Sequence, residues 1–129
     1  MAKSPEEWFV QSRYDVGTAE WLVTGRRHLY AVFMCHLSLE KALKGVCHKR
    51  EGKAPPKTHD LLYLVQRTRL LPPAKIADGL ARINELSVPT RYPDELKKMQ
   101  RVFTAIRTQG ILADTKEALK WLRREFSKP

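Results

Sequence analysis

The sequence predicts an all-α fold, a helical bundle formed by a single domain over residues 1–129. Apolar residues recur at helical spacing along most of the chain, and no segment alternates apolar and polar residues as a strand would. Glycines and prolines separate segments of helical length, which marks the ends of the expected helices. A chain of 129 residues is long enough to bury a core without disulfides.

The first two expected helices are long. Ser4, Pro5 and Glu7 form a Ser-x-x-Glu start signal, so the first helix should run from about Pro5 to Thr24 and end at Gly25. The second should cover residues 28–50 and end at Gly52.

The second helix is unusually apolar between Tyr30 and Leu39. A helix with so few polar side chains must be covered on nearly all sides, and we expect a second copy of the chain to supply part of that cover. It becomes polar at Glu40 and Lys41, where Glu40 and Lys44 are spaced for an i, i+4 ion pair. These charges are also what the solvated end of a buried helix would show.

The middle of the chain holds two shorter expected helices. Thr58 should cap a helix over 58–69, and prolines separate it from a helix over 73–86. Residues 87–94 are bracketed by Pro89 and Pro93, which predicts an extended conformation for Thr90-Arg91-Tyr92.

The C-terminal part should contain one short turn and one long helix. Asp94 is placed to cap a turn that reaches about Arg101. The last helix is expected over 103–126, although Gly110 and Asp114 leave open a break into two shorter helices.

Positive charge is concentrated in two parts of the chain, whose net charge is +10. Residues 41–69 hold eight Lys or Arg against two Asp or Glu, and residues 91–129 hold ten against five. Such a surface favours polyanions, including nucleic acid, nucleotide phosphates and acidic proteins. An ordinary solvated surface is the alternative.

Other sequence features limit the function classes. Cys35 and Cys47 lie too far apart on one helix for a disulfide, and reduced buried thiols fit a cytoplasmic protein. There is no CxxC pair, clustered metal ligands or glycine-rich phosphate loop, so we expect no metal and no cofactor. We find no signal peptide and no segment long enough to span a membrane.

Four pieces of the sequence together resemble the HEPN (higher eukaryotes and prokaryotes nucleotide-binding) domain family. They are Tyr30-x-Ala-x-Phe33, the Leu-Glu-Lys-Ala-Leu-Lys-Gly run 39–45, the Pro-x-Thr-His-Asp-Leu run 56–61, and the Thr-Arg-Tyr-Pro-Asp run 90–94. The resemblance covers nearly the whole chain and is closest to small stand-alone prokaryotic members. It implies a four- to five-helix up-and-down bundle that forms a two-fold homodimer. It also implies pairing with a minimal nucleotidyltransferase in a toxin–antitoxin-like module.

The sequence departs from the ribonuclease members of this family. Those members carry an Arg followed four to six residues later by a His, which the resemblance implies would hold and cleave a phosphodiester. Here the closest such pairs, Arg27–His36 and Arg50–His59, are nine positions apart, and no His follows Arg91. A ribonuclease would therefore require folding to bring His36 or His59 to Arg91.

Arg91 is the strongest candidate for binding a phosphate. A guanidinium offers a fork of donors that fits phosphate oxygens, although Arg91 could instead pair with Asp94 or Glu40 and brace the bundle. Tyr92 could stack on a base or pack on the bundle. Lys41, Lys44 and Glu40 complete the expected nucleotide or nucleic-acid site.

His36 and His59 are the candidate proton-transfer residues beside Arg91. His36 lies four residues before Glu40, so the two could orient each other, or His36 could make a buried hydrogen bond in the place where the family often has Gln. His59 could be a neutral capping residue at a helix start.

The leading hypothesis is a binding protein for nucleotide or RNA, and a ribonuclease toxin is the alternative.

Overall fold

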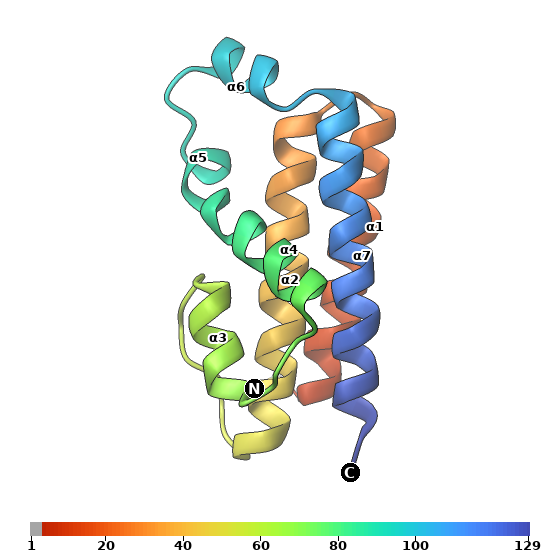
Figure 1. The fold of residues 1–129 in the computed structure, drawn as a ribbon, viewed down its shortest axis with the longest axis vertical. Coiled ribbons are helices and arrows are strands. Elements are labelled where there is room, and N and C mark those ends of the chain that lie inside the picture. Colours follow the sequence, from red (N-terminus) through yellow and green to blue (C-terminus); the bar gives the residue numbers. More distant parts are fainter. Residues whose placement is uncertain (1–3) are drawn as a thin grey trace.

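The computed structural model describes residues 4–129 and places them in seven helices without a strand (Figure 1). The helices are α1 (Pro5–Thr24), α2 (His28–Glu51), α3 (Leu61–Thr68), α4 (Ala74–Glu85), α5 (Ser87–Arg91), α6 (Leu96–Val102) and α7 (Ala105–Ser127). The predicted all-α class is confirmed. The count of four to five helices is too low, because α5 lies where the sequence predicted an extended segment and α6 forms where it predicted only a short turn.

Four of these helices give the bundle its up-and-down course. α1 and α4 run in one direction, and α2 and α7 run in the other, with α4 inclined across α2 (Figure 1). The short α3 packs beside the C-terminal end of α2, and α5 and α6 form a projecting arm between α4 and α7 (Figure 1).

The apolar part of α2 forms the centre of the core within a single chain. Leu39 and Leu43 are fully buried, together with Leu61, Leu64 and Leu122 from the surrounding helices. Within the chain, α1, α3, α4 and α7 supply most of the cover of α2, and the cover expected from a second copy stays a prediction. Tyr30 remains 52% exposed, and Phe33, Met34 and Leu37 are half-buried along the same side.

Gly45 allows α1 to lie close against α2. A Cβ atom at this position would lie 2.9 Å from two ring carbons of Phe9 and 3.1 Å from Cβ of Trp8. Phe9 in turn packs against Phe126 of α7, with ring centroids 4.5 Å apart. Because Gly45 has no side chain, Phe9 of α1 can lie directly against α2 while it also contacts Phe126 of α7.

The start of α3 differs from the prediction. The side chain of Asp60, not that of Thr58, caps the helix by accepting hydrogen bonds from the backbone N–H groups of Leu62 and Tyr63. Thr58 accepts a hydrogen bond from the Asp60 backbone N–H instead. His59 therefore precedes the helix and its side chain is available for another contact.

The prediction of an extended Thr90-Arg91-Tyr92 segment is wrong for its first two residues. Residues 87–91 form α5, directly after the C-cap residue of α4, Leu86. Pro89 is tolerated because it is the third residue of the helix, where the backbone N–H has no partner within the helix. Pro93 acts as expected on Tyr92, which leaves the helical conformation and ends α5.

The C-terminal elements begin slightly later than predicted. Glu95 precedes α6 without a side-chain capping bond, so Asp94 does not take the expected role. Thr104 caps α7 by accepting a hydrogen bond from the backbone N–H of Arg107. α7 then continues through Gly110 without a break, which settles the open alternative in favour of one helix.

The two cysteines are buried, as the sequence predicts. Cys35 and Cys47 are free thiols, and burial raises the pKa of each thiol to about 11.

Within residues 4–129, no helix has the length and apolar character needed to cross a membrane.

Candidate functional site

Glu40 is the centre of a buried cluster of ionisable side chains. Its carboxylate is 5% exposed, and its Oε2 lies 3.0 Å from Nζ of Lys44, one turn further along α2. Its Oε1 lies 2.9 Å from Nδ1 of His59, which precedes α3. The predicted Glu40–Lys44 pair is confirmed, and the carboxylate also binds a residue nineteen positions away.

His36 lies beside this carboxylate in a buried position. Its Nδ1 is 3.9 Å from Oε1 of Glu40, and no group in residues 4–129 makes a hydrogen bond of standard geometry with either ring nitrogen. Burial lowers the pKa of His36 from 6.5 to about 4, and Glu40 opposes this shift while Arg91 and His59 add to it. His36 is therefore neutral at pH 7.

Arg91 ends α5 on the same side of α2. Its guanidinium lies over the ring of Phe33, with 4.8 Å from Cζ to the ring centroid. Nε and Nη2 are buried and have no hydrogen-bond partner in the described part of the chain. The alternative ion pairs with Asp94 and Glu40 are not formed within 4.0 Å among these residues.

The fold places three ionisable residues near His36. The charges of Arg91, His59 and Glu40 all act on the pKa of His36, although the three residues lie on different elements. We call Arg91, Phe33, His36, Glu40, Lys44 and His59 the Arg91 corner.

Two candidate residues lie outside the Arg91 corner. Nζ of Lys41 is 2.8 Å from Oδ2 of Asp15, so Lys41 joins α2 to α1. Tyr92 is 70% exposed and does not pack on the bundle as the alternative proposed. These positions separate Lys41 from the expected nucleotide site and leave Tyr92 open to a ligand.

Sequence reasoning missed two residues that support the corner. Phe33 was part of the family resemblance, but only the fold shows that its ring supports the guanidinium of Arg91. Trp8 lies under Lys44, with Nζ 5.8 Å from the ring centroid, and donates a hydrogen bond to Nδ1 of His48. Neither contact follows from spacing along the chain, since the partners belong to different helices.

The corner offers cationic donors and a histidine–carboxylate pair, and cationic donors suit an anion. Within residues 4–129, no group of three or more His, Cys, Asp or Glu is arranged to hold a metal ion. The unpartnered donors of Arg91 match phosphate oxygens. The His59–Glu40 pair could orient an imidazole for proton transfer, since the His59 side chain is 58% exposed.

Comparison with known proteins gives one family and two similar structures. The chain matches the HEPN domain over residues 5–125. The crystal structure of ST0689, an archaeal HEPN homologue, superposes with a TM-score of 0.79 and 23% identity, covering 98% of this chain and 100% of the other. The crystal structure of TT1696 from Thermus thermophilus gives a TM-score of 0.78 and 23% identity, covering 93% of this chain and 96% of the other. At this identity the two structures establish the fold alone. No curated protein sequence matches.

Proposed function

Since this chain belongs to the HEPN domain family, we propose that it is a binding protein whose Arg91 corner holds the phosphate of a nucleotide. The observation that carries the proposal is the pair of buried, unpartnered donors on Arg91, Nε and Nη2. Two buried guanidinium nitrogens without an acceptor are costly unless a ligand completes their hydrogen bonds. A phosphate group can accept two parallel hydrogen bonds from such a fork.

The surrounding residues position Arg91 for this role. Phe33 supports the flat face of the guanidinium, and Nε and Nη2 along its edge are buried without an acceptor. Lys44 and His59 already bind the carboxylate of Glu40, so this carboxylate repels an incoming phosphate less than an unpaired one would. Tyr92 follows Arg91 directly and is exposed, which gives a nucleotide base an aromatic surface for stacking.

Replacing Arg91 tests the nucleotide site. Arg91→Lys keeps the charge but loses the planar fork, so we expect ATP to bind about tenfold more weakly, as measured by isothermal titration calorimetry at low salt. Arg101→Lys, on exposed α6, is the matched control and should leave binding unchanged. Equal affinities for the protein and Arg91→Lys would exclude a phosphate contact by the guanidinium.

We also propose the homodimer and the minimal nucleotidyltransferase partner that the family resemblance implies. Exposed apolar side chains near the corner support a contact there: Tyr30 and Leu96 line a common pocket of about 480 Å³, and Val88 and Tyr92 are mostly exposed. Light scattering after size-exclusion chromatography should give twice the chain mass at micromolar concentration. Tyr30→Ser combined with Leu96→Ser should then give the mass of one chain, and a monomeric unaltered protein would remove the dimer from the proposal.

A ribonuclease is the second candidate, and one observation favours it. Arg91 and His59 each lie close enough to His36 for their charges to act on its pKa, so His36 lies near both residues, as this chemistry would require in the absence of the usual Arg–His spacing. His59 is the accessible histidine of the two, since His36 is fully buried. Cleavage of RNA by the purified protein, lost in both Arg91→Lys and His59→Gln, would favour the enzyme over the binding protein.

A further inference from the structure

The charge of residues 41–69 gathers away from the Arg91 corner. Asp15 and Glu40 neutralise Lys41 and Lys44. Most of the later basic residues of this segment lie at or just beyond the C-terminal ends of α2 and α3, namely Lys49, Arg50, Lys53, Arg67 and Arg69. Glu40 and Arg50 are ten residues apart on α2, which corresponds to about 15 Å along the helix. This second surface is therefore separate from the proposed nucleotide site.

We call this surface the basic end, and define it by six cations: Lys49, Arg50, Lys53, Arg67, Arg69 and Lys128. Two carboxylates, Glu51 and Glu125, lie among them and are paired with Arg67 and Lys128. Hydrogen bonds from Arg67 lower the pKa of Glu51, and the charges of Lys53 and Arg69 act in the same direction. Six cations against two carboxylates leave a strong positive excess.

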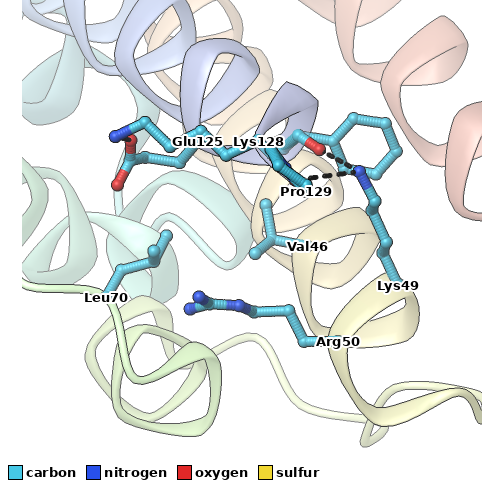
Figure 2. A pocket seen from close by; sticks show the side chains of 8 residues that line it. Val46, Lys49, Arg50, Leu70, Glu125, Lys128 and Pro129 are labelled. Carbon is cyan, nitrogen blue, oxygen red and sulfur yellow. Dashed lines mark hydrogen bonds and ion pairs between the residues drawn. The ribbon is translucent and has the colours of Figure 1, made fainter.

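Some of these cations bind carbonyl groups at helix ends, and others have no such partner. Lys49 donates to the carbonyl oxygens of Phe126 and Lys128 at the end of α7, as Figure 2 shows. Arg50 donates to the carbonyl oxygen of Thr68 at the end of α3. Lys53 and Arg69 are exposed and form neither a side-chain hydrogen bond nor an ion pair with any group in residues 4–129. Their charges are therefore available to a ligand.

Two hollows on either side of Arg50 give the basic end a shape. One, of about 440 Å³, is lined by Arg50, Glu51, Arg67, Thr68 and Arg69. The other, of about 280 Å³, lies between α2, Leu70 and the C-terminal residues, and Figure 2 shows the Arg50 side chain extending along it. Two adjoining hollows that share an arginine suit successive groups of an extended ligand better than a single ion.

An exposed aromatic ring lies beside the larger hollow. Tyr63 is 40% exposed, and its hydroxyl accepts a hydrogen bond from Nη1 of Arg67, which lines that hollow. Aromatic rings beside a basic groove are the feature by which proteins bind single-stranded nucleic acid, because bases stack on them. The acidic side chains of a peptide have no aromatic face that could stack on the ring.

We propose that the basic end binds single-stranded nucleic acid, with backbone phosphates at Arg69 and Lys53 and a base stacked on Tyr63. This binding site goes beyond the proposed nucleotide site and does not depend on it. The position of Arg69 offers a variant that removes its charge without straining the backbone. Arg69 has φ +61°, a left-handed conformation that glycine adopts readily, so Arg69→Gly keeps the end of α3.

The test uses fluorescence anisotropy of a labelled twenty-nucleotide oligothymidine at 50 mM and 200 mM salt. We expect Arg69→Gly with Lys53→Ser to weaken binding at least tenfold at 50 mM salt, and to reduce the salt slope by about 1.4, for two lost phosphate contacts. The matched control, Lys97→Ser with Lys98→Ser on α6, removes the same charge from the opposite end of the bundle (Figure 1). Equal losses in both double variants would reduce the binding to net charge and overturn the proposal.

Two substitutions at Tyr63 distinguish base stacking on its ring from a structural role of its side chain. Tyr63→Leu should weaken oligothymidine binding about tenfold, whereas Tyr63→Phe keeps the ring, loses only the hydroxyl, and should stay within about twofold. Equal losses of affinity in the two variants would assign the effect to the Arg67 hydrogen bond and overturn stacking.

A competition experiment tests the class of ligand. If polyglutamate displaces the labelled oligothymidine as well as unlabelled oligothymidine of equal charge does, nucleic acid is overturned as the ligand.

Discussion

Replacing Glu40 with leucine should lower the free energy of unfolding by about 3–5 kcal/mol, because it leaves the ammonium group of Lys44 buried without its carboxylate partner. The Lys44 side chain is only 10% exposed, and Glu40 is its ion-pair partner at 3.0 Å. The ring of Trp8 at 5.8 Å offers a weaker contact that cannot replace a full negative charge. Urea denaturation at pH 7 measures the change.

A double variant distinguishes the loss of the pair from the loss of the carboxylate itself. Glu40→Leu combined with Lys44→Met replaces both charges with apolar groups, so we expect it to recover most of the lost stability. Glu20→Gln is a suitable control, since its ion pair with Lys116 is about half exposed and should contribute less than about 1 kcal/mol. If the double variant is as unstable as Glu40→Leu, the buried ammonium is not the cause.

The protein should lose stability as the pH falls from about 6.5 to about 4, and His36→Gln should lose less. The pKa of His36 is about 4 in the folded chain, against 6.5 when it is unfolded and exposed to water. Between these values the unfolded chain binds a proton that the folded chain excludes, so acid favours unfolding. At pH 4.5 this linkage amounts to about 2–3 kcal/mol.

Glutamine removes the proton-binding group while it preserves a polar side chain of similar reach. The stability of His36→Gln relative to the unaltered protein should therefore rise by about 2–3 kcal/mol between pH 7.5 and pH 4.5, measured by urea denaturation at each pH. The difference at pH 7.5 serves as the internal reference, because His36 is neutral there in both states. Parallel pH profiles for the two proteins would contradict a depressed pKa at His36.

The helix ends show where local sequence was sufficient. The side chain of Ser4 caps α1 as predicted, and Gly25 and Gly52 follow α1 and α2 at the expected positions. These signals act within one turn of the chain, so they do not depend on what packs against the helix. The Glu40–Lys44 pair was predictable for the same reason, since one helical turn separates the two residues.

The wrong predictions concern places where local signals compete. Thr58 and Asp60 are both good caps, and the choice of Asp60 left His59 free to reach Glu40. Pro89 predicts a helix break by residue type, although a proline in the first turn removes no helical hydrogen bond. The apolar stretch of α2 also predicts an interface between subunits, which stays a prediction, and within the chain the surrounding helices cover most of that stretch.

The sequence alone determined the helical class, the long helices and the residue types available for binding an anion, because periodicity, caps and charge are local properties of the chain. The tertiary structure decided which of those residues meet. It placed Arg91 over Phe33 near His36, and it paired Lys41 with Asp15. It also brought most of the later cations of residues 41–69 together at the C-terminal end of α2. These pairings join residues far apart in the chain, and only the packing of the helices fixes the distance between them.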